Sequence, residues 1–144
     1  MMGHDVEYST ALDDDRLLAL AKDESRVLLT RDLELYKRSI ARGIDAFYVE
    51  GKTEPERLAA LSKRFGIPLR IDLQNSRCPK CNTPIQSAPK AAVVDRVEKN
   101  TFANYDEFWE CPKCGKIYWQ GAHWPKILAT LEEARNRLKN GAVV

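Results

Sequence analysis

The stretch FWECPKCGKIYW, residues 108–119, decides how the C-terminal half of this chain folds. Its Cys-Pro-Lys-Cys motif also occurs at residues 78–81, and residues 82–110 separate the two motifs. Each pair of cysteines can form a turn that points two thiolates at one ion, and four thiolates make a closed tetrahedral Zn²⁺ site. Asn82 and Gly115 directly follow the two motifs and tolerate the positive φ that such turns often need. The sequence therefore predicts a structural Zn²⁺ bound by Cys78, Cys81, Cys111 and Cys114.

An alternative for these cysteines is a pair of independent redox-active Cys-x-x-Cys motifs. The duplication of the whole Cys-Pro-Lys-Cys form favours a zinc ribbon instead. A module of this size buries too little apolar surface to fold by itself, so zinc would supply folding free energy on the order of 10–16 kcal/mol. Four cysteines used in this way are typical of a reducing compartment, and the N-terminal residues lack the pattern of a secretory signal. The expected location is the cytoplasm.

The composition is that of a globular protein: of 144 residues, 44% are hydrophobic and 31% are charged, with a formal net charge of +2. These values exclude a disordered chain, and no apolar run approaches the roughly 18 residues of a transmembrane helix. Residues 1–75 carry 12 basic and 14 acidic side chains, whereas residues 76–144 carry 11 and 7. We therefore expect an acidic domain over 1–75, a basic zinc ribbon over 76–124, and a helix with a tail over 125–144.

The first 75 residues alternate between helix-like and strand-like patterns. Apolar residues at spacings of three and four indicate helices, and short apolar runs indicate strands. Thr53 and Glu56 form a capping-box pattern, and Gly66 ends the helix that it opens. The expected elements are strands at 6–8, 26–30 and 46–49, helices at 13–24, 32–42 and 53–66, and an edge strand at 67–73. This order implies an α/β fold with a small parallel sheet covered by helices.

Acidic residues follow two of these expected strands. Asp13, Asp14 and Asp15 come after the strand at 6–8, and Asp32 comes after the strand at 26–30. Ligands bind outside the carboxyl ends of parallel strands, and carboxylates gathered there could hold Mg²⁺ or Mn²⁺, which activates water for phosphodiester hydrolysis. The alternative is that these residues only cap helices and complement their dipoles. Two carboxylate positions are also too few to specify a metal site without a third.

Aromatic and basic residues alternate around the second cysteine motif. We expect residues 108–110 and 116–119 to be two β-strands that pair with each other. Aromatic rings beside lysines can stack on unpaired bases while the ammonium groups meet phosphates, which predicts an RNA contact at Lys113, Lys116 and Trp119. The alternative is that the rings form the small core of the ribbon. The aromatic residues are Trp109, Tyr118, Trp119 and Trp124, and the final helix, at 125–139, carries an apolar stripe.

Several segments of the sequence resemble one known family. They are residues 3–8, 14–18, 27–32 and 76–81 and, most specifically, the stretch YDEFWECPKCGKIYWQGAHW at 105–124. These segments resemble the RNase domain family named after the C-terminal part of the nematode mut-seven protein, over about residues 3 to 124. That family joins a PIN-like nuclease domain to a C-terminal zinc ribbon. The resemblance implies metal-dependent RNA cleavage, with Asp14, Asp15 and Asp32 as metal-binding carboxylates and the four cysteines as zinc ligands.

The chain departs from the family pattern at its beginning. Family members start with a further strand that ends in Asp, followed by a helix, whereas this sequence begins at the turn that comes next, around Gly3 and Asp5. We therefore expect a truncated PIN-like sheet and negligible Mn²⁺-dependent RNase activity for residues 1–144. Three hypotheses follow. They are a metal-dependent endoribonuclease, a non-enzymatic RNA-binding or ribosome-associated module, and an adaptor that binds other proteins.

Overall fold

The computed structural model describes residues 2–8 and 11–139. The chain divides into two compact units, which we treat separately. The cysteine unit contains Met1–Glu7 and Pro68–Glu133, and the parallel-sheet unit contains Tyr8–Ile67 and Ala134–Val144. The division expected from the sequence, into 1–75, 76–124 and 125–144, stays a prediction.

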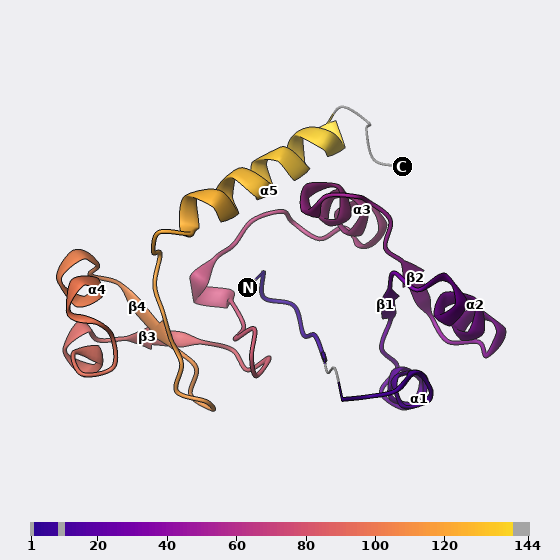
Figure 1. Cartoon of the computed structure of the whole chain (residues 1–144), viewed down its shortest axis with the longest axis horizontal. Coiled ribbons are helices and arrows are strands. Elements are labelled where there is room, and N and C mark those ends of the chain that lie inside the picture. Colours follow the sequence, from indigo (N-terminus) through magenta and orange to yellow (C-terminus); the bar gives the residue numbers. More distant parts are fainter. Residues whose placement is uncertain (1, 9–10, 140–144) are drawn as a thin grey trace. The chain divides into compact units, whose positions relative to one another are not determined.

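The parallel-sheet unit alternates helices with strands (Figure 1). Its elements are α1 (Asp14–Asp23), β1 (Leu28–Thr30), α2 (Leu33–Ala41), β2 (Ala46–Tyr48) and α3 (Glu54–Phe65). The two strands pair in parallel, with Leu28 opposite Ala46 and Thr30 opposite Tyr48. Helices α1 and α2 both contact β1. The α/β class, with a small parallel sheet and flanking helices, is therefore confirmed.

The helical spacing seen in the sequence produces the core of this unit. Leu18 and Ala21 lie one turn apart on α1 and pack with Leu35 of α2 and with Ile44. Leu28 of β1 packs against the same group. One apolar stripe on each helix is thus buried against its neighbours.

Two of the strands expected from the sequence do not form. Residues 6–8 are not a strand, because the Val6 N–H donates to Asn82 Oδ1 at 2.8 Å and Asp5 accepts a hydrogen bond from Asn82 Nδ2. These contacts hold Asp5 and Val6 beside Asn82, which directly follows the first cysteine motif. Residues 67–73 are not a strand either. Pro68 removes a ladder donor, and Leu73 is buried beside the cysteines, in a short 3₁₀ helix at Leu73–Asn75.

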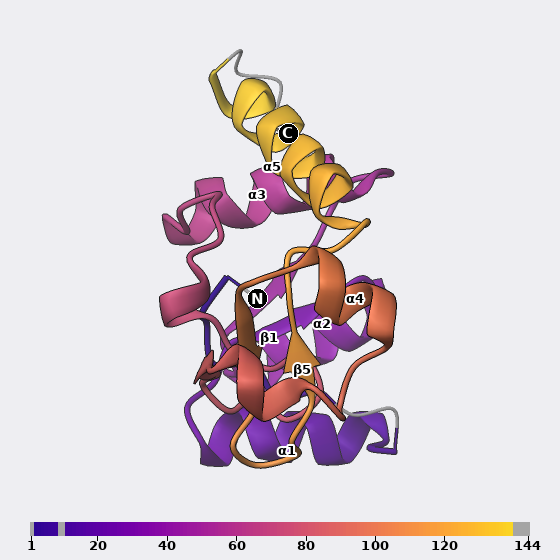
Figure 2. The same cartoon turned by 90° about the vertical axis from the view of Figure 1, so that its left-hand side faces the viewer.

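The cysteine unit contains an antiparallel sheet. Its strands are β3 (Gln86–Ala88), β4 (Phe108–Glu110) and β5 (Ile117–Tyr118), in the order β3-β4-β5. The expected pairing around the second motif is confirmed, with Trp109 opposite Tyr118. Strand β3, the 3₁₀ helix Lys90–Val93 and helix α4 (Lys99–Asn104) were not predicted from the sequence. Strands β3 and β4 are labelled in Figure 1, and β5 and α4 in Figure 2.

The two faces of this sheet bury different groups of residues. Trp109 packs with the cysteines, Leu73 and Ile85, whereas the preceding residue, Phe108, packs with Val93 and other apolar residues on the opposite face. Successive side chains of a strand point to opposite faces, so both sides of β4 are covered. The cysteine cluster therefore lies on one defined face of the sheet.

The last helix, α5 (Trp124–Lys139), follows the predicted range closely. Leu131 and Ala134 are buried, and Ile127 and Leu138 are half-buried, so the expected apolar stripe is the covered one. None of the helices among the described residues is long and apolar enough to cross a membrane.

A capping box opens helix α3. Thr53 Oγ1 accepts a hydrogen bond from the Glu56 N–H, and Glu56 Oε2 accepts one from the Thr53 N–H at 3.4 Å. Glu56 Oε2 also accepts a shorter one from the Lys52 N–H, at 2.7 Å. Arg137 of α5 lies 3.5 Å from the Glu56 carboxylate. The Lys52 N–H is the main reason why the pKa of Glu56 lies below its ordinary value, and the Arg137 charge acts in the same direction. Gly66 ends the helix with a φ of 68°.

We predict that Glu56 stabilises the folded chain and that this stabilisation decreases as the pH becomes acidic. Its pKa is lower in the folded state, so its contribution is complete above the unfolded pKa of about 4.3 and disappears as the pH falls through the folded pKa. In urea titrations followed by circular dichroism, the difference in unfolding free energy between wild type and Glu56→Gln should be constant above about pH 5.5 and shrink below about pH 4. Glu54→Gln, in the same turn, controls for the loss of one acidic charge. A difference that does not change with pH would contradict the prediction.

Candidate functional site

The two cysteine motifs form turns with the same backbone hydrogen bonds. In each turn the carbonyl of the first cysteine accepts a hydrogen bond from the N–H four residues later, and its own N–H donates to the carbonyl five residues later. The distances are 2.7 Å from Asn82 to Cys78 and 2.8 Å from Gly115 to Cys111, then 2.9 Å from Cys78 to Thr83 and 3.0 Å from Cys111 to Lys116. We call these turns the first and second knuckle.

Both knuckles turn through a residue with positive φ. Asn82 has a φ of 61° and Gly115 a φ of 76°, which confirms the expectation from the sequence. An arginine donates to the carbonyl of each of these residues: Arg77 Nη1 to Asn82 at 2.8 Å, and Arg96 Nη2 to Gly115. Arg96 is itself fixed by Glu110, whose carboxylate lies 2.7 Å away.

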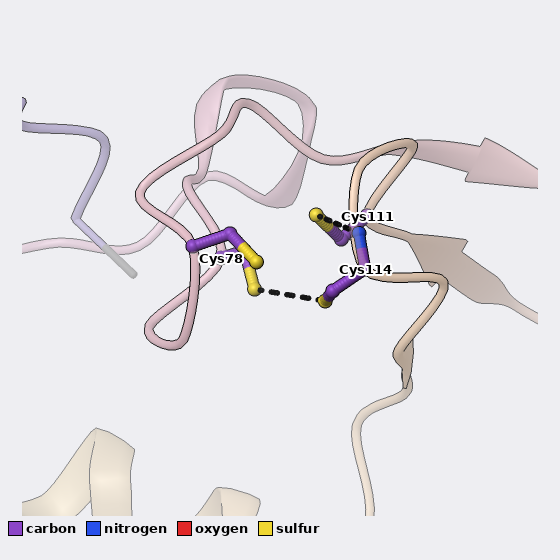
Figure 3. A group of neighbouring side chains, drawn as sticks. Cys78, Cys111 and Cys114 are labelled. Atoms are coloured by element: carbon purple, nitrogen blue, oxygen red, sulfur yellow. Dashed lines mark hydrogen bonds between the residues drawn. The ribbon is translucent and has the colours of Figure 1, made fainter.

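The four cysteine sulfurs lie close enough to share one ion. They all lie within 4.8 Å of one another, and Cys78 Sγ is 3.8 Å from Cys114 Sγ. In Figure 3 these two sulfurs face each other from separate turns. A tetrahedral ion with Zn–S bonds of about 2.3 Å sets its sulfurs about 3.8 Å apart. All four cysteines are free thiols, so this group can hold a metal ion such as Zn²⁺.

Hydrogen bonds around Cys78 favour its thiolate form. Burial raises the pKa of this thiol, but the Tyr118 hydroxyl, 2.9 Å from Cys78 Sγ, and the N–H groups of Cys81 and Lys80 outweigh burial and lower the pKa to about 6. Burial also raises the pKa of Tyr118, so its phenol stays protonated and can donate. The same donors would stabilise the sulfur of a metal-bound Cys78.

The pKa of Cys111, in the second knuckle, is lowered like that of Cys78, whereas the pKa of Cys81, in the first knuckle, is raised. Burial raises the pKa of Cys111, but the N–H groups of Cys114 and Lys113 outweigh it and lower this pKa. The pKa of Cys81 rises to about 12, chiefly because of its hydrogen bond with Cys114 and then because of burial and the neighbouring negative charges. If all four cysteines were ionised, a cation between them would be needed to offset their negative charges.

The aspartates predicted for catalysis take part in helix capping and ion pairs. Asp32 is the N-cap of α2, and its Oδ1 accepts hydrogen bonds from the N–H groups of Glu34 and Leu35 at 3.0 and 3.2 Å. Thr30 Oγ1 accepts the Asp32 N–H at 3.0 Å. Asp13 caps α1 in the same manner. Asp32 therefore caps a helix, which is the role that the alternative interpretation of the sequence predicted for it.

Asp14 and Asp15 form ion pairs with α2. Arg38 lies 3.5 Å from Asp14 and 2.9 Å from Asp15, and Arg42 lies 3.6 Å from Asp15. Arg38 and Arg42 lie in the C-terminal half of α2 and just after it, whereas Asp32 caps the other end. Among the described residues, the four cysteines are the one group of three or more potential ligands close enough to hold a metal. The structure does not bring the three aspartates together.

The predicted RNA-contact residues differ in exposure. Lys113 and Lys116 are exposed, whereas Trp119 is half-buried and its ring lies 6.3 Å from that of Phe108. Trp109 is buried at 5% exposure beside the cysteines. The core interpretation therefore holds for Trp109, and Trp119 keeps part of its surface accessible.

Three residues that contact the knuckles were not predicted as part of the site: Arg77, Arg96 and Tyr118. Arg77 directly precedes the first motif, which was a usable signal. Arg96 lies between the motifs with no distinctive spacing. Tyr118 contacts a cysteine of the other knuckle, so its role depends on how the two knuckles meet.

We predict one Zn²⁺ per purified chain, measured by elemental analysis together with a thiol assay. Cys111→Ser removes a buried ligand and leaves an open site of three thiolates, so zinc affinity should fall by more than the roughly 10–100-fold typical of changes outside the ligand shell. The cysteine unit should lose its structure in near-UV circular dichroism. Cys114→Ser, at an exposed ligand, should cost less stability. Well under one zinc per chain in wild type, with all thiols free, would contradict the prediction.

Comparison with known proteins places the chain in a family. No curated protein and no solved structure matches it. The model of the family described as Mut7-C RNAse domain matches residues 1–131 of the 144. This range includes the four cysteines and the three aspartates. Because the match covers most of the sequence, the chain belongs to the Mut7-C RNAse domain family.

Proposed function

We propose that the protein acts on RNA and that its cysteine unit binds the RNA strand. Family membership carries this proposal, because the matched family is described as an RNase domain and the match continues through the cysteine unit to residue 131. The excess of basic over acidic side chains in residues 76–144, 11 against 7, supports binding of a polyanion.

The surface of the second knuckle offers suitable contacts. Lys113 lies within the motif and Lys116 follows it, and both are exposed. The Lys116 ammonium lies 5.4 Å from the centroid of the Tyr118 ring, which restrains its side chain. Cations held on a rigid turn lose little freedom when they meet phosphates. The accessible part of Trp119 could stack on an unpaired base.

We predict that Lys113→Ala with Lys116→Ala weakens binding of single-stranded RNA and flattens its salt dependence. Loss of two phosphate contacts should reduce the slope of log affinity against log salt by about 1.4. The measurement is fluorescence anisotropy with a labelled oligouridylate over a salt series. Lys22→Ala with Lys37→Ala makes the same change of charge in the parallel-sheet unit and should leave the slope unchanged. RNA affinity that is undetectable at low salt would contradict the proposal and favour a protein or ribosomal partner.

RNA cleavage is the second candidate, and the description of the family favours it. It would require Asp14, Asp15 and Asp32 to hold Mg²⁺ or Mn²⁺ together. In the arrangement described above they do not fit one such site, because Asp32 caps α2 and the other two pair with Arg38 and Arg42. These ion pairs would have to open before the carboxylates could meet.

Two variants at Asp32 separate its capping role from a metal-binding role. Asn caps helices about as well as Asp, whereas Ala does not. We predict that Asp32→Ala lowers the unfolding free energy by about 1 kcal/mol and that Asp32→Asn leaves it nearly unchanged, measured by urea titration. Mn²⁺-dependent cleavage by wild type that disappears in Asp32→Asn at unchanged stability would establish the second candidate. Cleavage that survives Asp32→Asn would indicate a different site or a contaminant.

A further inference from the structure

Tyr118 connects the two halves of the cysteine cluster. It lies on β5, directly after the second knuckle, yet its hydroxyl is 2.9 Å from the sulfur of Cys78 in the first knuckle. Cys78 is only 1% exposed, so this hydroxyl occupies a position at the sulfur that water cannot easily take.

Neighbouring residues fix the orientation of this tyrosine. Tyr118 is the cross-strand partner of Trp109, and both side chains pack against the group of residues that contains Cys78 and Cys111. The Lys116 ammonium lies over the Tyr118 ring, 5.4 Å from its centroid. A side chain held by its strand, its partner and a cation has few alternative rotamers, so the contact with Cys78 is preorganised.

We propose that Tyr118 is a positioning residue of the metal centre. Its O–H donates a hydrogen bond to the metal-bound sulfur of Cys78 and thereby slows release of the ion. A metal-bound thiolate carries no proton and can only accept, so the tyrosine must be the donor. This hydrogen bond offsets part of the negative charge on the sulfur and fixes the orientation of the Cys78 side chain. Hydrogen bonds of this kind to metal ligands are commonly worth about 10–100-fold in metal affinity.

The four ligands are therefore not equivalent. Cys78 is buried and bonded to a side-chain hydroxyl, whereas Cys114 is exposed. Cys111 accepts the backbone N–H of Cys114 at 3.5 Å, a longer contact. The proposal depends on metal binding by the cysteines and is independent of RNA binding, so either can fail without the other.

The test compares Tyr118→Phe with wild type in the full zinc-loaded chain. Phenylalanine keeps the ring, its packing and the Lys116 contact, and removes only the hydroxyl. We expect zinc transfer to a chromogenic chelator to become at least tenfold faster. Tyr105→Phe, at a half-buried tyrosine on the other apolar group of the same unit, is the matched control and should match wild type. A Tyr118→Phe rate within twofold of wild type, or equal acceleration in Tyr105→Phe, would overturn the proposal.

A spectroscopic measurement separates hydrogen bonding from packing. In the Co²⁺-loaded protein, loss of a hydrogen bond to a ligand sulfur raises the energy of the sulfur donor orbital. The sulfur-to-cobalt charge-transfer band should therefore move to longer wavelength in Tyr118→Phe and stay in place in Tyr105→Phe. A band at the wild-type position in Tyr118→Phe would also overturn the proposal.

Discussion

The gathering of four cysteine sulfurs within 4.8 Å of one another is the constraint on which the cysteine unit depends. As thiolates these sulfurs would repel one another, and a divalent cation at their centre would offset that repulsion. Three kinds of contact support the four cysteines. The knuckles aim N–H groups at the sulfurs, two arginines hold the knuckles, and Leu73, Ile85 and Trp109 exclude water from one side.

The parallel-sheet unit is stabilised by ordinary means, and this bears on function. Its helices pack a small apolar core, Asp32 caps α2, and Asp15 pairs with Arg38. A carboxylate that caps a helix is already hydrogen-bonded, so recruiting it to a metal means giving up part of that cap. The two units thus differ: the cysteine unit presents four sulfurs that could hold a metal ion, and in the other unit the aspartates predicted for catalysis make a helix cap and ion pairs.

Local patterns in the sequence predicted the parts of the fold that local chemistry determines. The capping box at Thr53 and the positive φ at Asn82 and Gly115 depend on neighbours within a few residues, and all three are present. The strands expected at 6–8 and 67–73 do not form, because a strand needs a neighbouring strand with which to pair. The sequence of a single segment does not show whether such a neighbour is present. Arg96 and Tyr118 contact the knuckles because segments that are distant in the sequence meet in the fold. The spacing of the cysteines therefore could not predict these contacts.

The two knuckles share the same backbone hydrogen bonds but do not tolerate the same replacements. At Gly115 only the turn matters, whereas the Asn82 side chain also holds Asp5 and Val6. Glycine at position 82 would keep the turn but remove two hydrogen bonds that help to hold the N-terminal segment, so the two knuckles are not interchangeable. Exchanging one knuckle sequence for the other would preserve the metal ligands while removing an attachment point for the beginning of the chain.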